Sequence, residues 1–454
     1  MLAAGSFNKE YLIDIFNFAI NAADPYRAVM ERLRVAGDKI ILSEGEYNLN
    51  DFSRIIVVGA GKAVVPMACA VEEVFENRIE EGVVIVKYGH AGTLRKIRQI
   101  EASHPLPDLN GVSGTNEIMD VLKKADEKTL VICLLSGGAS SLLVSPITDL
   151  NLEDKQSVTD LLLKAGANIN ELNTIRKHLS NVKGGRMAEI AHPATIVTMI
   201  LSDVIGDRLD VIASGPTVPD PTTYEDAIDV IRKYGLGDKI PVKVARILGD
   251  GQKGKLKETP KGNEEFFRET RTVIVGGIKE AINAAWKKAE SLGFATEIMT
   301  SELQGEAREA ARDLAARAIE ARNAMKTGDD PRCLLSGGET TVTVRGSGLG
   351  GRNQELALAF AKEIEGKSRI SLLSAGTDGT DGPTDAAGAI VDSSTISLAR
   401  QYKLDVEFYI ENNDSYHFFE KLDSLSGERY HLKTGPTGTN VMDLQIIMVD
   451  KNGN

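Results

Sequence analysis

Two copies of one short motif contain residues that could bind an anion. Cys133–Gly138 and Cys333–Gly338 both read CLLSGG. Each copy predicts a buried strand that runs into a glycine-rich loop. A loop of this composition can bind an anion, because glycine lets successive backbone N–H groups turn inward toward a ligand. The residues expected in these two strand-end loops are Ser136, Gly137 and Gly138 in the first copy, and Ser336, Gly337 and Gly338 in the second.

Two cations follow glycine turns where a helix is expected to begin. Lys62, in VVGAGKAVV, could reach a phosphate as a point charge, although an exposed surface lysine explains it equally well. Arg352, in GLGGRNQEL, lies at a helix N-terminus, where the helix dipole disfavours a free cation. A bound carboxylate or phosphate, held in a bidentate manner, would explain that placement.

The segment 171–190, ELNTIRKHLSNVKGGRMAEI, is strongly basic in an acidic protein. Asn173, Arg176 and Lys183 are its candidate ligand-binding residues. The two glycines that follow Lys183 are expected to open another helix, so that backbone donors and cations could converge there. The alternative is an ordinary solvated helix face.

Aspartates gather in two places. Asp203 and Asp207 follow a predicted strand, and three more occur in TDGTDGPTD, at Asp378, Asp381 and Asp385. Magnesium takes one or two carboxylates together with ligand phosphates and waters, and a strand-end aspartate can also orient or deprotonate a hydroxyl. Asp-Gly pairs also mark simple turns, which is expected to explain at least half of these residues.

Several common catalytic motifs are missing or incomplete. Gly59 and Gly61 begin a dinucleotide-binding pattern, but its third glycine is replaced by Val64 and its acidic residue by Lys87. There is no Walker A motif, no protein-kinase motif set, no GxSxG and no HExxH. The six histidines are scattered and are expected to be structural.

The composition indicates a soluble, cytoplasmic protein. The chain has 454 residues and a formal net charge of −12, which argues against nucleic-acid binding. Its three cysteines have no metal-ligand or disulfide pattern, and no run of 18 apolar residues could span a membrane. The N-terminal stretch is expected to form an amphipathic helix rather than a signal peptide.

Apolar runs without alternation predict strands that are buried on both faces, as in parallel sheets between helices. The polar segment 249–265 is the best candidate for a linker or long surface loop. We therefore expect an α/β fold with two domains, each a mostly parallel sheet sandwiched between helices, with an active-site cleft between them. The expected domains are 1–262, of Rossmann-like type, and 263–454.

A set of motifs, in order, resembles the class II glycerate kinases, or glycerate 2-kinases, over nearly the whole chain. These motifs are VVGAGKA, ELNTIRKHLSNVKGG, LSDVIGD, SGPTVPDPTTYEDA, SGGETTVTV, GRNQELALA and SAGTDGTDGPTDAAGA. The resemblance implies transfer of the ATP γ-phosphoryl group to the 2-hydroxyl of D-glycerate, giving 2-phosphoglycerate and ADP. It also implies two α/β domains and no P-loop.

Candidate roles follow when the resemblance is combined with the residues. Lys62 would stabilise the transferring phosphoryl group, and Arg352 would hold substrate or phosphate. The Ser-Gly-Gly loops and the basic segment would hold phosphates. Asp203 is the catalytic carboxylate candidate and Asp207 and Asp378 are the candidates for Mg²⁺, although Asp203 and Asp378 could exchange these roles.

Two other functions are kept open. One is an NAD(P)H-dependent hydroxypyruvate reductase, a name that members of this family have carried. The incomplete dinucleotide motif argues against it. The other is a non-catalytic anion-binding protein of the same fold. In each case the partner is a small molecule rather than a nucleic acid or a membrane, and a homo-oligomer is left open.

Overall fold

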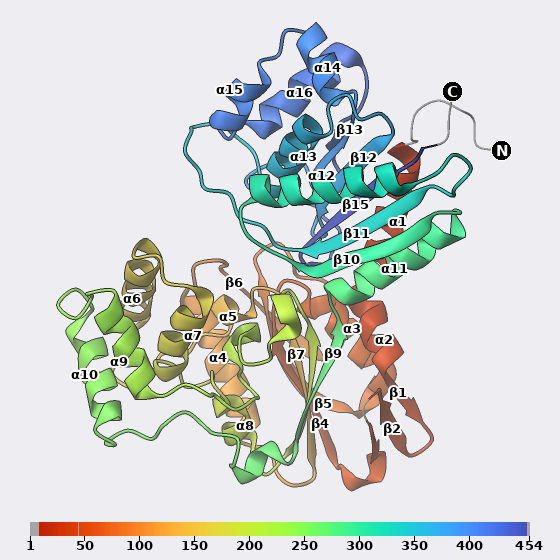
Figure 1. The fold of residues 1–454 in the computed structure, drawn as a ribbon. Coiled ribbons are helices and arrows are strands. Elements are labelled where there is room, and N and C mark those ends of the chain that lie inside the picture. Colours follow the sequence, from red (N-terminus) through yellow and green to blue (C-terminus); the bar gives the residue numbers. More distant parts are fainter. Residues whose placement is uncertain (1–8, 44, 452–454) are drawn as a thin grey trace. The chain divides into compact units, whose positions relative to one another are not determined.

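The computed structural model describes residues 9–43 and 45–451, which form two compact units (Figure 1). The N-terminal unit is Pro25–Val275, and the C-terminal unit combines Met1–Asp24 with Gly276–Asn454. The predicted division at residue 262 lies before this boundary because strand β9 (Thr270–Gly276) still belongs to the N-terminal sheet. Helix α1 (Lys9–Ala22) belongs to the C-terminal unit, where it packs on α11 (Ile278–Ser291).

The N-terminal unit contains a six-stranded sheet in the order β6-β5-β4-β7-β8-β9. Its first five strands in that order run parallel, as the sequence predicts. Strands β7 and β8 are buried along their whole length, which explains why their sequences do not alternate. The remaining bounds are β4 Arg54–Ala60, β5 Ile79–Lys87, β6 Ile97–Ala102, β7 Thr129–Leu135 and β8 Thr195–Leu201.

Helices cover both faces of this sheet (Figure 1). Helix α3 (Val64–Phe75) packs on β4, β5 and β7, and α4 (Leu109–Leu122) packs on β5 and β6 from the other side. A small antiparallel sheet precedes them, made of β1 (Leu33–Ala36), β2 (Lys39–Leu42) and β3 (Gly45–Asn48). The short helices of this unit include α2 (Pro25–Arg32), α5 (Ala139–Leu142) and α8 (Arg186–Ala191).

Four helices of the N-terminal unit form a cluster with its own apolar core (Figure 1, yellow to green). They are α6 (Leu152–Lys164), α7 (Ile169–His178), α9 (Tyr224–Lys233) and α10 (Val242–Gln252). Three of them begin at a capping box, in which the side chains of the first and fourth residues bond each other's backbone N–H groups. Local sequence therefore defines where these helices start.

The polar segment 249–265 is not a linker between the units. It begins inside α10 and continues as irregular chain within the N-terminal unit. Glu258, in this segment, accepts hydrogen bonds from the Tyr224 N–H at 2.9 Å and from His178 Nε2 at 2.8 Å. Burial alone would raise the pKa of Glu258, but these donors outweigh burial and lower it to about 2.

Glu258 should therefore make stability depend on pH on the acidic side. A carboxyl with a lowered pKa in the folded state stabilises the protein above its unfolded pKa, and that stabilisation is lost as pH falls from about 4.5 to about 2. Because Glu258 is partly exposed, we expect it to contribute about 1–2 kcal/mol at pH 7. Urea unfolding should show that Glu258→Gln loses more stability at pH 7 than at pH 3, where only part of the stabilisation by the ionised carboxylate remains. An equal loss at both values would contradict this assignment.

The C-terminal unit contains a second six-stranded sheet, in the order β10-β11-β15-β12-β13-β14. Strands β10 and β11 run parallel, and the other four pairs of neighbouring strands in this sheet are antiparallel. The predicted α/β architecture is confirmed, but a mostly parallel sheet occurs only in the N-terminal unit. An uninterrupted apolar sequence indicates that a strand is buried on both faces, but it does not indicate whether the strand pairs with its neighbours in a parallel or an antiparallel manner. The bounds are β10 Ala295–Leu303, β11 Arg332–Gly338, β12 Ile370–Gly376, β13 Gly388–Asp392, β14 His431–Leu432 and β15 Asp443–Val449.

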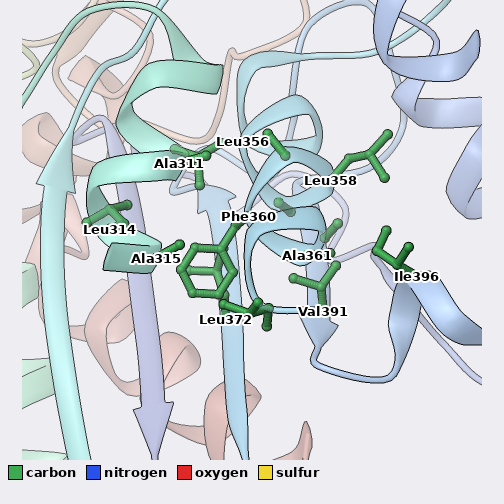
Figure 2. Packing of buried hydrophobic residues seen from close by; sticks show 14 of the residues in the cluster. Ala311, Leu314, Ala315, Leu356, Leu358, Phe360, Ala361, Leu372, Val391 and Ile396 are labelled. Atoms are coloured by element: carbon green, nitrogen blue, oxygen red, sulfur yellow. The ribbon is translucent and has the colours of Figure 1, made fainter. Parts of the chain in front are cut away.

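The core of the C-terminal unit lies between its sheet and two helices, α12 (Ala307–Ala324) and α13 (Arg352–Glu363). Figure 2 shows Ala315 of α12 and Phe360 of α13 meeting above Leu372 of β12. Small alanines on α12 let the two helices approach closely while Phe360 fills the space against the strands. The last helices are α14 (Thr395–Gln401), α15 (Val406–Glu411) and α16 (Ser415–Ser426).

The predicted N-terminal helix is present as α1, with Leu12, Ile15 and Phe16 buried against the C-terminal unit. The first eight residues of that stretch lie outside the described residues. Among the described residues, no helix combines the length and the apolar character that a membrane crossing requires.

Candidate active site residues

The carboxyl ends of the parallel strands form one edge of the N-terminal sheet. Ala60, the last residue of β4, is paired with Ile85 of β5 and with Leu135 of β7. Lys87, the last residue of β5, is paired with Ala102 of β6. The loops that follow these strands therefore begin at neighbouring positions, at the edge where open α/β sheets bind ligands.

The first Ser-Gly-Gly motif forms the loop that the sequence predicts, and it interlocks with the loop that carries Lys62. The Ser136 N–H donates to Ala60 O at 3.2 Å, and the Lys62 N–H donates to Gly137 O at 2.8 Å. The Ala63 N–H donates to Ser136 Oγ at 3.0 Å. A Cβ at Gly61, whose φ is +144°, would overlap Ser136 Oγ. The close contact of these loops explains why glycine is needed there.

Two backbone donors of this loop are available. Among the described residues, the N–H groups of Gly137 and Gly138 donate to no acceptor. Gly138, at φ +85°, then turns the chain into α5. Adjacent free N–H groups in a glycine turn are a suitable arrangement for phosphate oxygens.

Two lysines and a histidine lie at the same edge. Within the described part of the chain, neither Lys62 nor Lys87 forms a salt bridge with a carboxylate. His104 follows β6, and a Cβ added to Gly138 would lie 2.9 Å from its ring. Burial, followed by the charges of Lys62 and Lys87, lowers the pKa of His104 to about 4, so the ring is neutral at pH 7.

Sequence reasoning did not select Lys87 or His104 as site residues. Lys87 entered only as a mismatch to a dinucleotide motif, and His104 as one of six scattered histidines. The available signal for Lys87 was positional, because it stands at the end of a predicted strand, and applying the carboxyl-edge rule to that strand would have found it. His104 follows β6, a strand that was not predicted from the sequence, so the same rule could not have found it.

Asp203 and Asp207 follow β8 at the same edge, and both are half-buried. Asp207 has a φ of +53° and follows Gly206 in a tight turn. Asp378 belongs to the C-terminal unit, where its Oδ1 accepts from the N–H and Oγ1 of Thr380, each at 3.0 Å. No group of three or more His, Cys, Asp or Glu side chains suited to a metal ion occurs among the described residues.

Asn173 and Lys183 are buried in one polar network beside α5. Ser214 Oγ donates to Asn173 Oδ1 at 3.0 Å and lies 2.8 Å from Ser140 Oγ. Lys183 Nζ donates to Ser140 O at 2.8 Å. Ala213 and Ser214 have positive φ values of 52° and 61°, and such strain in non-glycine residues is typical of functional sites.

The predicted backbone donors after Lys183 are already occupied. The N–H of Gly184 donates to Ser214 O at 3.0 Å, and that of Gly185 donates to Gly215 O at 2.7 Å. These bonds support the strained segment rather than a ligand. Arg176 is half-buried on α7 and has no protein partner within the described residues, and burial lowers its pKa.

Arg352 begins helix α13 and is held by a buried carboxylate. Its Nε donates to Asp443 Oδ2 at 2.6 Å and its Nη2 donates to Asp443 Oδ1 at 2.9 Å, while Nη1 contacts Glu339. Burial alone would lower the pKa of Arg352, but the hydrogen bond and charge of Asp443 outweigh it and raise the pKa. The side chain is 33% exposed, so one face can still reach a ligand.

Asp443 was not selected from the sequence, although it begins the last strand. Its side chain is 1% exposed, and burial raises its pKa despite the opposing effect of Arg352. Asp381, from TDGTDG, instead caps α13 by accepting from the N–H groups of Asn353 and Gln354 at 3.0 and 2.9 Å. Asp385 pairs with Lys433 at 2.9 Å. These two aspartates have structural roles, in line with the turn alternative.

The second Ser-Gly-Gly motif does not form a loop. Ser336, Gly337 and Gly338 lie inside β11 and pair with Gln445, Leu444 and Asp443 of β15. A Cβ at Gly337 would overlap the side chain of Ile278 in α11, and one at Gly338 would overlap the backbone of Leu303. The prediction of a second strand-end loop is therefore wrong. Close packing accounts for these glycines.

Gly337→Ala provides a test of this structural role. The added methyl group must displace Ile278 of α11, and overpacking of this kind costs about 1–3 kcal/mol. Thermal unfolding should show a lower melting temperature, with KM for each substrate changed less than about twofold. A large rise in KM without loss of stability would instead assign Gly337 to a binding site.

Together these features define a two-unit α/β protein with a cationic, glycine-lined strand edge in its N-terminal unit. Residues 11–249 match a model described as a domain of unknown function (DUF4147), and residues 332–443 match the MOFRL family. The chain is 44% identical to the D-glycerate 2-kinase of Thermotoga maritima over 97% of this chain and 98% of that protein. It is 39% identical to a putative hydroxypyruvate reductase of Agrobacterium vitis, over 97% and 94%.

The solved structure of a glycerate kinase from Thermotoga maritima has the same fold. Its TM-score is 0.85 at 43% identity, and the match covers 97% of this chain and 99% of that one. The chain belongs to the glycerate kinase family.

Proposed function

We propose that this protein transfers the γ-phosphoryl group of MgATP to the 2-hydroxyl of D-glycerate, giving 2-phosphoglycerate and ADP. The observation that carries the proposal is that Lys62 and the free N–H groups of Gly137 and Gly138 lie in two interlocked loops at one edge of the sheet. Phosphoryl transfer depends mainly on positioning and on neutralising the charge of the transferring group. A lysine without a carboxylate partner, beside open backbone donors, meets both needs.

Roles for the other residues follow from the same reasoning. Arg352, aligned by Asp443, would hold a carboxylate or phosphate with its exposed face. Asp203 is the candidate to orient the attacking hydroxyl, and Asp207 and Asp378 are the candidates for contact with the magnesium of MgATP. Magnesium needs only one or two protein carboxylates when phosphates and waters fill its shell.

The second Ser-Gly-Gly motif is left out of the proposed site because packing explains it. A cytoplasmic location is also part of the proposal. It is supported by Cys69, Cys133 and Cys333, which are all free thiols.

The rival function is an NAD(P)H-dependent reductase, since one relative is named as a putative hydroxypyruvate reductase. Val64 and Lys87 occupy the positions where a dinucleotide site needs a glycine and a carboxylate. Lys87 in particular lies where a carboxylate would accept hydrogen bonds from the ribose hydroxyl groups, and its ammonium group cannot accept them. A phosphate-binding role agrees better with the charge of this edge.

The reaction can be followed directly by ³¹P NMR on the protein with MgATP and D-glycerate. The proposal expects the 2-phosphoglycerate resonance to grow as the ATP γ-phosphate signal falls. A 3-phosphoglycerate resonance would keep the kinase and overturn the assigned hydroxyl. Unchanged ATP, together with oxidation of NAD(P)H by hydroxypyruvate, would replace the kinase with the reductase.

A further inference from the structure

Three lysines are buried among the described residues, and all lie in or near the helical cluster of the N-terminal unit. They are Lys155 on α6, Lys177 on α7 and Lys183 in the loop after α7, with exposed fractions of 6%, 2% and 1%. A buried lysine is expected to have a carboxylate partner, because an ammonium group loses its hydration on burial. The three residues differ in how this need is met.

Lys177 has the expected partner. Its Nζ lies 3.1 Å from Asp220 Oδ1, and the Asp220 side chain is fully buried. Lys183 has no carboxylate partner and donates instead to neutral oxygens, namely Ser140 O at 2.8 Å, Ser140 Oγ at 3.2 Å and Ala213 O at 3.4 Å. Lys177 therefore serves as an internal reference for the other two.

Lys155 has no hydrogen-bond partner among the described residues, and its Nζ is buried. Burial, followed by the positive charges of Arg176 and Arg186, lowers the pKa of Lys155 to about 7. Burial, with Lys155 and Arg176, also holds the pKa of Lys183 well below its usual range. Lys155, Arg176 and Lys183 thus act on one another, with Arg186 also acting on Lys155, and none of the four forms a salt bridge with a carboxylate within the described residues.

We infer that Lys155, Arg176 and Lys183 form a buried subsite for a small oxyanion, either a phosphate group or a carboxylate. The inference deepens the proposed function, since each reactant of that function carries such a group. Lys155 was not recognised in the sequence, where it is one lysine in the amphipathic segment LEDKQSVTDLLLK. The polar network of Asn173, Ser140 and Ser214 joins the subsite at Lys183.

The physical argument rests on a cost that only a ligand would offset. An unpaired buried amine lowers the stability of the protein without a ligand, and an apolar residue of similar length would remove this cost. A bound oxyanion would supply the missing acceptor and favour the charged amine. The subsite should therefore reduce stability while it contributes to binding.

Lys155→Met separates this role from a structural one. Isothermal titration calorimetry would measure binding of inorganic phosphate, D-glycerate and Mg·AMP-PNP to the wild type and the variant. We expect the variant to bind at least one of these about tenfold more weakly, since hydrogen bonds to charged groups are strong. We also expect its ligand-free melting temperature to rise by about 3 °C or more.

The three ligands distinguish the source of the oxyanion. A loss confined to D-glycerate identifies a carboxylate subsite, and a loss with phosphate or Mg·AMP-PNP identifies a phosphate subsite. Proton uptake offers a second readout at pH 8, measured from the buffer dependence of the binding heat. Wild type should take up a proton on binding, and Lys155→Met should take up less.

Lys177→Met is the matched control, because it removes a buried lysine of the same cluster that has a carboxylate partner. It should lower the melting temperature, since Asp220 is left unpaired, and change ligand affinity less than about twofold. If Lys155→Met does not fold, Arg176→Met at a half-buried position decides the question alone, with the same tenfold loss expected.

Unchanged affinity of Lys155→Met for all three ligands would overturn the subsite. Binding is measured without turnover, so this result is independent of the kinase assay. If binding weakens as expected but ³¹P NMR shows no phosphorylation, the subsite stands and the proposed reaction fails.

Discussion

Replacement of Lys62 by alanine is expected to lower kcat for ATP-dependent phosphorylation of D-glycerate by about 1,000-fold. Removing one positive charge that an enzyme holds against the transferring phosphoryl group typically lowers kcat by a factor of 10²–10³ or more. Lys62 is positioned by its own backbone, which donates to Gly137 O at 2.8 Å, so its side chain can be removed without disturbing the loop. Initial rates under saturating MgATP and D-glycerate measure the effect.

The Lys62→Ala variant should separate catalysis from binding. KM for ATP should change less than about fivefold, because the N–H groups of Gly137 and Gly138 are still present. Lys62→Arg should recover only part of the activity, since a planar fork does not replace a compact ammonium group. Lys39→Ala, at an exposed lysine paired with Glu46, is the control and should retain full activity. A Lys62→Ala enzyme with normal kcat would remove this residue from the chemistry.

The second large effect concerns the ion pair between Arg352 and Asp443. Arg352→Ala is expected to lower the free energy of unfolding by about 3–5 kcal/mol at pH 7, because it leaves the carboxylate of Asp443 buried and unpaired. Asp443→Asn should cost less, since the arginine left behind is 33% exposed and also contacts Glu339. Urea unfolding of both variants would measure this difference.

The double variant tests whether the buried charge causes the loss. Arg352→Ala combined with Asp443→Asn should recover most of the stability that Arg352→Ala alone loses. Without Arg352, the already raised pKa of Asp443 should rise further. The loss of stability therefore comes from the ionised form of Asp443, which is buried without a partner. The destabilisation of Arg352→Ala should therefore be smaller at pH 4 than at pH 7. Equal losses at both values would show that the charge of Asp443 is not the cause.

Activity of these variants distinguishes substrate contact from positioning. Both single variants should lose kcat, because Arg352 is removed in one and misaligned in the other. If Arg352 holds a substrate anion, Arg352→Lys should raise KM for that substrate, since lysine cannot donate in a bidentate manner. Asp443→Asn should instead lower kcat with a smaller change in KM. Full activity of both variants would limit the pair to a structural role.

Much of the N-terminal site could be predicted because its signals are local. The glycine turn with Lys62 and the first Ser-Gly-Gly motif each follow an apolar strand, and parallel strands place such loops at one edge. Lys155 and Asp443 could not be found this way. Each is significant because of what surrounds it after folding: the positive charges of Arg176 and Arg186 around Lys155, and Arg352 beside Asp443.

The repeated motif shows where local sequence stops being sufficient. CLLSGG determines a buried strand in both places, since its apolar residues must leave water. In the first copy, β7 lies between parallel strands, its pairing with β4 and β8 extends to Leu135, and Ser136-Gly137-Gly138 turn away as a loop. In the second, antiparallel β15 continues to pair through Gly338 and keeps the same three residues in the strand.

The sequence alone thus determined buried apolar strands and capped helix starts, because each depends on neighbouring residues along the chain. Tertiary structure decided which Ser-Gly-Gly copy keeps free backbone donors, because a distant strand either uses those positions or leaves them open. It also decided which lysines are unpaired, since burial and the nearest carboxylate are set by segments far apart in the chain.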